Sequence, residues 1–158
     1  MRKKQIFMIF ILIASIISLS SCLNQDSNEH KENNNIMEDE EMKIKITNDQ
    51  YEVFYSLNDS EASKSLYKQL PIDTVVENYG SSEKIFYPPQ ALEIQDTPLL
   101  KNGGIGTLGY FAPWNNVVMY YGSCEAYDGL YILGEVIKGG EYIKNLSGTL
   151  HIEKIEAL

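Results

Sequence analysis

The sequence predicts a mainly β domain over residues 43–158, an antiparallel barrel or sandwich with one helix. Three observations support this fold class. Short stretches alternate between apolar and polar residues, as expected of strands with one buried face. Glycine, proline and asparagine separate these stretches, and only one segment has helical spacing. A domain of this length can bury roughly 65% of the surface that its unfolded chain exposes, which suffices for one core.

The first predicted elements are a β-hairpin and the helix. Apolar residues alternate over 42–57, and Asn48 begins a polar pair that favours a turn between two strands. Asn58 is expected to cap a helix over 59–70, because Glu61 follows three residues later as in a capping box. Apolar residues at every fourth position support this helix, and a proline ends it.

The rest of the domain is predicted to consist of strands and one irregular segment. A strand is expected over 72–76. The proline-rich segment 85–100 is expected to be irregular, with one short turn of helix near 88–92. Turn-forming residues separate the remaining apolar stretches. These predict strands over roughly 106–112, 116–121, 130–137 and 149–156.

Residues 1–21 have the organisation of a lipoprotein signal peptide. Three basic residues at 2–4 precede an apolar run over 6–19, which is too short for a membrane span of about 20 residues. The run ends in Leu19-Ser20-Ser21-Cys22, which resembles the lipobox of bacterial lipoproteins. That resemblance implies cleavage before Cys22 and a diacylglyceryl thioether on its sulfur. The protein would then be anchored on the extracytoplasmic side of a membrane; the alternative is an uncleaved anchor helix.

Residues 22–42 are predicted to be the acylated cysteine followed by a disordered acidic tether. They contain seven acidic side chains, one lysine and few apolar residues, so they cannot bury enough surface to fold. Twenty flexible residues span about 25 Å by random-coil scaling. Because no basic patch follows the cleavage site, lipid on Cys22 is the predicted contact with the membrane.

The charge distribution excludes nucleic acid as a partner. The whole chain has a formal net charge of −9, and beyond residue 21 there are 10 basic against 22 acidic side chains. A nucleic-acid-binding protein needs a basic face, so no nucleic acid is expected as a partner. Arg2 is the only arginine, and it lies in the signal peptide. Nothing in the sequence indicates a partner chain, and a monomer is expected.

A set of short motifs spread over about 43–156 resembles the cyclophilin-like fold domain of bacteria. The most specific part is Tyr110–Val117, read as strand, turn and strand. The other motifs are Asn58-Asp59-Ser60, Leu70-Pro71, Glu83-Lys84-Ile85, Tyr120-Tyr121 and Leu133-Gly134-Glu135-Val136. The resemblance implies a closed eight-stranded β-barrel with one or two capping helices.

The resemblance also implies kinship in fold with peptidyl-prolyl isomerases, but fold does not determine function. Those enzymes use an arginine as an oriented donor, and this domain has none. A lysine such as Lys84 could donate, but it lacks the planar fork of arginine. We therefore expect a peptide- or small-ligand-binding module without catalytic residues. The alternatives are a weak prolyl isomerase that assists secreted proteins and a structural component of the envelope.

Aromatic residues are the candidate ligand-binding residues. Alternation puts Tyr110 and Phe111 on opposite faces of one strand, and Tyr120 and Tyr121 on opposite faces of another. One member of each pair should fill the barrel, and the other should face outward. Outward aromatic side chains suit contact with a peptide or small molecule, although ordinary packing is the simpler interpretation. The predicted ligand-binding residues are Tyr87, Tyr110, Trp114 and Tyr120.

Three other features predict no site. The segment Gly104–Gly109 matches a dinucleotide-binding pattern by spacing, but strand-like residues follow it where that motif requires a helix. Cys124 has no local base, so it is expected to be a small half-buried residue or a spare thiol. His151 lies in a predicted strand and is expected to be exposed or hydrogen-bonded. No metal site and no cofactor are predicted.

Overall fold

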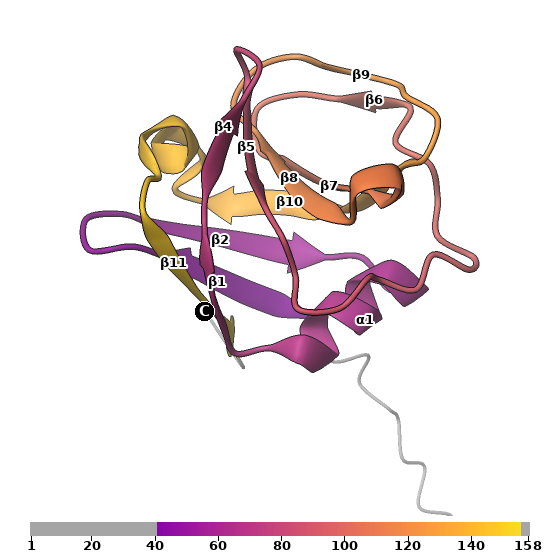
Figure 1. Cartoon of the computed structure of the whole chain (residues 1–158), viewed down its shortest axis with the longest axis horizontal. Helices are drawn as coiled ribbons and strands as arrows, with labels where there is room; N and C mark the ends of the chain where they lie inside the picture. Colours follow the sequence, from indigo (N-terminus) through magenta and orange to yellow (C-terminus); the bar gives the residue numbers. More distant parts are fainter. Residues whose placement is uncertain (1–40, 156–158) are drawn as a thin grey trace, which may run out of the picture. The chain divides into compact units, whose positions relative to one another are not determined.

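Nine antiparallel strands form one sheet that curls into a nearly closed barrel in the computed structural model, which describes residues 41–155 (Figure 1). The strand order is β3-β11-β1-β2-β10-β7-β8-β5-β4, and a separate two-stranded sheet pairs β6 with β9. The strands are β1 (Lys43–Thr47), β2 (Glu52–Leu57), β3 (Ile72–Val75), β4 (Glu77–Tyr79), β5 (Glu83–Phe86), β6 (Asn102–Gly103), β7 (Thr107–Phe111), β8 (Asn116–Tyr120), β9 (Cys124–Glu125), β10 (Leu130–Lys138) and β11 (Thr149–Ile155). The predicted signal peptide, Cys22 and nearly all of the predicted tether lie outside the described residues.

The barrel closes through the segment 72–79. Its first half, β3, pairs with β11, and its second half, β4, pairs with β5 at the other end of the sheet. Between the two halves, Val76 donates its backbone N–H to the carbonyl of Gly148 over 3.0 Å. If this segment is counted as one strand that changes partners at Val76, the barrel has eight strands. The predicted mainly β barrel is therefore confirmed, and the count differs only at this break.

The strands predicted from alternation are present, and three corrections concern the segments between them. The expected strand over 72–76 is β3. The chain continues from it into β4 and then turns back to form β5, and the sequence indicated neither β4 nor β5. β6 and β9 are two residues each and were also not predicted. The residues after Gly139 form a 3-10 helix, η2 (Gly140–Asn145), where only a turn was expected. Residues 151–155 of β11 pair with the whole of β1, which joins the two ends of the domain's chain in one sheet.

The hairpin turn between β1 and β2 is formed by Asn48, as the sequence predicted. Its side-chain oxygen accepts hydrogen bonds from the backbone N–H groups of Gln50 and Tyr51, over 3.1 and 2.8 Å. Its side-chain amide donates to the carbonyl of Ser147 over 3.2 Å, which ties the turn to the loop before β11. One asparagine thus fixes both the turn and its position on the barrel.

The predicted helix is confirmed as α1 (Glu61–Gln69), but its N-cap is Ser60 and not Asn58. The Ser60 hydroxyl accepts from the backbone N–H of Ser63, and Asn58 instead supports the loop before the cap. The Asn58 side-chain oxygen accepts from the Ser60 backbone N–H and from the Ser63 hydroxyl, and its amide donates to Ile132. Asn58 therefore joins the helix start to β10.

We expect Asn58→Ala to lower the free energy of unfolding by about 2 kcal/mol, because several buried or half-buried hydrogen bonds lose their common partner. Loss of the cap alone, in Ser60→Ala, should cost about 1 kcal/mol. Asp59→Ala changes an exposed neighbour and is the matched control. Urea denaturation of the three variants checks this order. Equal stability of Asn58→Ala and Asp59→Ala would contradict the role assigned to Asn58.

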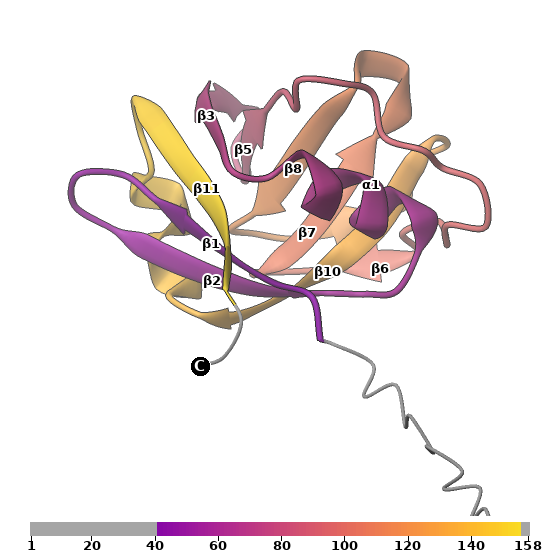
Figure 2. The same cartoon turned by 90° about the horizontal axis from the view of Figure 1, so that it is seen from below.

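The expected turn of helix near 88–92 is absent, and this prediction is wrong. The structure has no helix in that segment, where the Leu92 N–H donates to the Tyr110 hydroxyl and so makes no helical bond to the carbonyl of Pro88. The other helical elements are η2 and a short 3-10 helix, η1 (Ala112–Trp114). In two views, α1 and η2 lie on opposite sides of the barrel (Figures 1 and 2).

Two apolar clusters lie on the two faces of the barrel wall. The larger cluster fills the interior and includes residues from every long strand, α1 and η2, with Leu66, Tyr110 and Ile143 fully buried. The smaller cluster contains Val118 and Tyr120 on the outer face of β8. It is covered by the segment that carries β6 and β9. Pro113 and its neighbours connect the two strands, β7 and β8, that contribute to both clusters.

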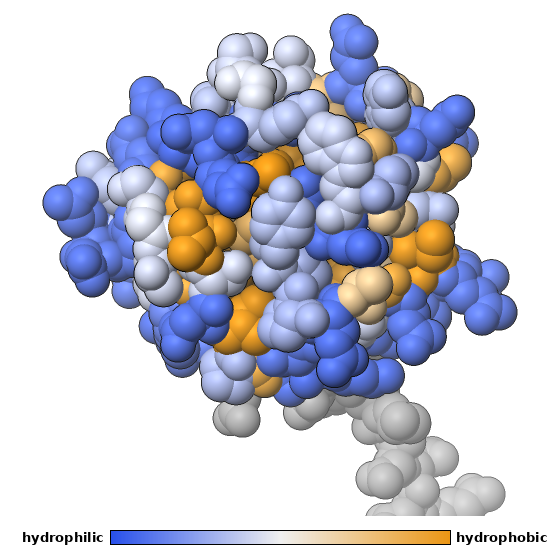
Figure 3. All heavy atoms as spheres, viewed as in Figure 1, coloured by the Kyte–Doolittle hydropathy of each residue, from blue (hydrophilic) through white to orange (hydrophobic). Residues whose placement is uncertain are grey.

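The surface in view in Figure 3 mixes hydrophobic and hydrophilic residues. Hydrophobic residues occur in small separate areas between charged and polar ones. Within residues 41–155, no helix is long and apolar enough to cross a membrane.

Candidate functional site

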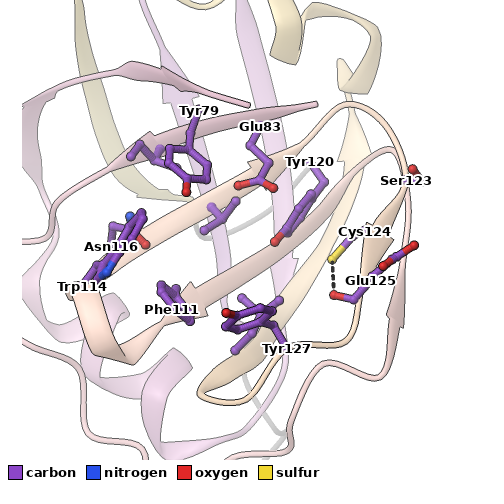
Figure 4. Close-up of a pocket in the computed structure, with 13 residues that line it drawn as sticks. Tyr79, Glu83, Phe111, Trp114, Asn116, Tyr120, Ser123, Cys124, Glu125 and Tyr127 are labelled. Atoms are coloured by element: carbon purple, nitrogen blue, oxygen red, sulfur yellow. Dashed lines mark hydrogen bonds between the residues drawn. The ribbon is translucent and has the colours of Figure 1, made fainter. Parts of the chain in front are cut away.

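A pocket of about 420 Å³ lies against the outer face of the barrel wall. Strand alternation explains why this face carries it. Along β8, Val117 and Met119 point into the barrel core, so Asn116, Val118 and Tyr120 point outward. The outward side chains of β5, β7 and β8 form the floor, and the segment around β9 forms one wall (Figure 4).

Edge-to-face aromatic contacts form one side of the pocket. The ring of Trp114 lies 5.3 Å from that of Tyr79 and 5.4 Å from that of Phe111, measured between centroids. Phe111 also contacts Tyr127, at 5.7 Å. Trp114 is 49% exposed and Tyr127 is 68% exposed, so large apolar side chains reach solvent at one place. Such a cluster is typical of a ligand-binding or protein-binding surface.

The pocket is acidic. The carboxylate of Glu83 points into the space between Tyr79 and Tyr120, whereas Glu125 lies at the outer edge beyond Cys124 (Figure 4). Partial burial raises the pKa of Glu83 above its usual range. Among the pocket-lining residues of 41–155 there is no lysine, arginine or histidine.

We expect Glu83→Gln to raise the melting temperature at pH 7. Because the folded state raises the pKa of Glu83, ionisation of this carboxyl opposes folding, and stability is lost as pH rises through the folded pKa. The variant and the natural protein should converge below the ordinary carboxyl pKa, where both side chains are neutral. Glu77→Gln on neighbouring β4 is the exposed control. A lower melting temperature for Glu83→Gln at pH 7 would show that the carboxylate has a stabilising partner.

One polar atom in the pocket wall has no partner. Asn116 is only 2% exposed, and its side-chain oxygen is buried without a hydrogen bond to any residue of 41–155. Leaving a buried acceptor unpaired costs about 1–3 kcal/mol, so such groups need an explanation. A ligand that donates a hydrogen bond in the pocket would supply the missing partner.

Cys124 borders the same pocket but is not an activated nucleophile. Its side chain is buried, and burial raises the pKa of the thiol. The thiol donates to the Glu125 carbonyl over 3.5 Å.

His151 lies on β11, where its ring contacts the Asp73 carboxylate at 2.8 Å, as expected for a hydrogen-bonded structural histidine. Residues 41–155 contain no group of three or more metal-ligating side chains.

The structure brings together two of the four predicted ligand-binding residues. Trp114 and Tyr120 line the pocket. Tyr110 instead fills the barrel core, where its hydroxyl accepts from the Leu92 N–H and donates to the Asn115 side chain, both over 3.0 Å. Tyr87 is exposed but does not line the pocket. The predicted alternation is confirmed, because Tyr110 and Tyr121 pack on the core while Phe111 and Tyr120 face outward.

Sequence reasoning missed Tyr79, Glu83, Asn116 and Tyr127. Tyr79 and Glu83 lie on strands β4 and β5, which sequence reasoning did not predict. It therefore could not say to which face of the sheet their side chains point. For Asn116, the signal was present: it is the polar residue that begins β8 on the same face as Tyr120, four positions later. Tyr127 lies in the segment after β9, where no periodic pattern indicates a direction.

Lys84, the lysine considered as a substitute for the missing arginine, points away from the pocket. It precedes Ile85 on β5 and faces the opposite side of the strand from Glu83. Its ammonium donates to the Asn78 side chain and to the Leu146 carbonyl, each over 2.6 Å. The Lys84 side chain is therefore buried and hydrogen-bonded on the inner face of β5, where it cannot serve the pocket.

Comparison with known proteins agrees with this architecture. Residues 46–154 match the sequence model described as the Cyclophilin-like family. The structure is similar to the solution structure of the hypothetical protein AF2241 from Archaeoglobus fulgidus, with a TM-score of 0.60 and 17% sequence identity. That match covers 73% of this chain and 96% of the archaeal one, and at this identity it shows the fold alone. No curated protein matches the sequence.

Proposed function

Because the chain belongs to the Cyclophilin-like family, we propose that it uses this barrel as a lipid-anchored, extracytoplasmic binding module for a peptide or small molecule. The pocket on the outer barrel wall carries the proposal. It combines half-exposed aromatic rings, a half-buried carboxylate and an unpaired buried amide oxygen. Apolar walls with a few placed polar groups are typical of ligand sites. The lipobox-like end of the signal peptide and the acidic tether support the anchored location.

Binding is tested by calorimetric titration of the full chain, in detergent, with a set of short peptides. We expect at least one peptide to bind saturably, and Tyr79→Ala to weaken that binding because it removes a ring that contacts Trp114. Tyr142→Ala is the matched control, since Tyr142 is similarly exposed but lies outside this pocket. Equal loss of binding in both variants would show that the pocket is not the binding site.

The proposed lipid anchor has a direct test. We expect Cys22→Ala to release the protein from the membrane fraction, because its two acyl chains are the only anchor in the proposal. Cys124→Ala is the control, since this buried thiol takes no part in anchoring. Fractionation followed by immunoblotting measures both variants. If Cys22→Ala stays with the membrane, the lipoprotein assignment is wrong.

Weak prolyl isomerisation is the second candidate, and kinship in fold is what favours it. The domain has no arginine, and Lys84 is turned into the barrel, so no cationic donor lines the pocket. A protease-coupled assay with a proline-containing peptide separates the two candidates. We expect no acceleration. Acceleration that is lost in Trp114→Ala would favour the isomerase.

A further inference from the structure

Three pocket side chains form one row across three strands. Tyr79 on β4 lies directly opposite Glu83 on β5, and Glu83 lies directly opposite Tyr120 on β8. Directly opposite residues in antiparallel strands share a face, and their Cβ atoms lie about 4.5–5.5 Å apart. The carboxylate of Glu83 is therefore flanked by two aromatic rings on the pocket floor (Figure 4).

Glu83 is an anion without a counterion in this row. Burial is the only cause of its raised pKa, and no residue of 41–155 forms an ion pair or hydrogen bond with its carboxylate. The other acid–base pairs of the barrel, such as Lys45–Glu153 at 2.6 Å, lie elsewhere. A carboxylate beside aromatic faces is an arrangement that attracts cations, both through the charge and through the ring quadrupoles.

A second row lies further along β8. Asn116 is directly opposite Phe111 on β7, and Trp114 packs against Phe111. Tyr120 follows Asn116 by four positions, which places the two rows about 13 Å apart along the strand. Val118 and Ile85, which are also paired, form an apolar floor between them. The unpaired oxygen of Asn116 is an acceptor at this end of the pocket.

We propose that the pocket binds a protonated amine carried on an apolar stem, with a second hydrogen-bond donor at the far end of the ligand. This inference rests on the proposed binding function and names its ligand class. The ammonium would lie beside Glu83 between the two tyrosines, the stem would cover Val118, and the second donor would reach Asn116. A lysine side chain in an extended peptide and a free diamine both have this chemistry.

Other ligand classes fit the same pocket less well. An anionic ligand would meet Glu83 without any basic side chain to offset the repulsion. A wholly apolar ligand would cover Glu83 and leave both polar groups unpaired, which costs free energy at each of them. A ligand with donors at both ends satisfies both. The acidic surface of the domain would also concentrate cations near the pocket.

The test compares two peptides that differ in one group. Acetyl-Ala-Lys-Ala-amide carries the ammonium, and acetyl-Ala-norleucine-Ala-amide has a similar stem without charge. Trp114 is the only tryptophan of the chain, so its fluorescence reports occupancy of this pocket in the full-length protein. We expect the lysine peptide to bind roughly tenfold or more tightly than the norleucine peptide, because its ammonium pairs with a carboxylate.

Two variants assign this preference to the named residues. Glu83→Gln should bring the affinity for the lysine peptide down to that for the norleucine peptide, while Glu141→Gln on η2, outside this pocket, leaves the preference intact. Asn116→Ala should weaken both peptides to a similar extent, because its acceptor serves the second donor and not the ammonium. Thermal unfolding of each variant shows whether it is folded. If Asn116→Ala does not fold, a lysine peptide with ester linkages tests the same contact, because an ester lacks the N–H that an amide would donate to Asn116.

The outcomes separate this inference from the proposed function. Equal affinity for both peptides, or a preference that survives Glu83→Gln, would overturn the cation proposal and leave a binding module. Absence of binding by any peptide or by 1,5-diaminopentane would overturn both. Saturable binding of 1,5-diaminopentane with none of the lysine peptide would identify a free amine as the source. Saturable binding of the lysine peptide with none of 1,5-diaminopentane would identify a lysine side chain.

Discussion

Replacing Gly134 with alanine is expected to lower the free energy of unfolding by at least about 3 kcal/mol. Gly134 lies in β10 between β2 and β7, next to an irregularity in the pairing. A Cβ atom placed there would come within 2.2 Å of the Ser56 carbonyl oxygen and 2.9 Å of the Leu57 Cα atom. Both obstacles are backbone atoms, so no rotation of a side chain relieves them.

Gly104→Ala is the matched control for this prediction. A Cβ at Gly104 would meet no atom within 4 Å, and the residue is also a glycine in the same barrel. Its stability should stay within about 0.5 kcal/mol of that of the natural protein. Urea denaturation, followed by far-UV circular dichroism, compares the two variants. Similar stability of Gly134→Ala and Gly104→Ala would mean that β10 and β2 are further apart than the structure places them.

Tyr110→Ala is expected to cost about 4 kcal/mol of stability, because it leaves a large cavity in the barrel core. The ring is 1% exposed, and its hydroxyl bonds to the Leu92 backbone and to the Asn115 side chain. Tyr110→Phe keeps the ring and removes only these two bonds. It should cost about 1–2 kcal/mol, because the Leu92 donor is also buried.

Tyr87→Ala is the matched control for Tyr110→Ala. Tyr87 is 43% exposed, so its removal should change stability by no more than about 0.5 kcal/mol. The two tyrosines look equivalent as candidate ligand contacts in the sequence, yet the structure gives them opposite environments. Thermal or urea denaturation distinguishes them. A stable Tyr110→Ala variant would place this ring outside the core.

The strands that sequence reasoning found either alternate or form short apolar stretches between turn-forming residues. β1 alternates strictly between polar and apolar residues, β7 and β8 are mainly apolar stretches on either side of Pro113, and the hairpin turn has its own asparagine signal. β5 was not found because Lys84 occupies an inward-facing position, where its polar side chain breaks the pattern. Its ammonium is satisfied by Asn78 on the neighbouring strand β4 and by the carbonyl of Leu146, 62 positions along the chain, and the second contact is one that no local pattern can indicate.

The candidate site was only partly predictable for a related reason. Alternation correctly separates Tyr110 from Phe111, but it does not say which face is the inside of the barrel. That assignment depends on how eight strands close, and the closing segment includes β4, which has three exposed residues and no apolar pattern. The acidic character of the pocket was hidden for the same reason, since Glu83 follows this strand. Trp114 was identified because it lies within the one specific motif, and Tyr120 because alternation places it and Tyr121 on opposite faces of the next strand.

The closing segment 72–79 also determines what the barrel offers to a second copy of itself. β3 and β4 each use one edge for a barrel partner, which leaves unpaired edges of only four and three residues. The chain after β5 lies beside this edge, since the Thr74 hydroxyl donates to the Tyr87 carbonyl. Edges this short give an incoming strand too few backbone partners for growth by strand addition. Copies of this domain held close together, as the proposed lipid anchor would hold them, would therefore find on this segment only edges of three or four residues to pair with.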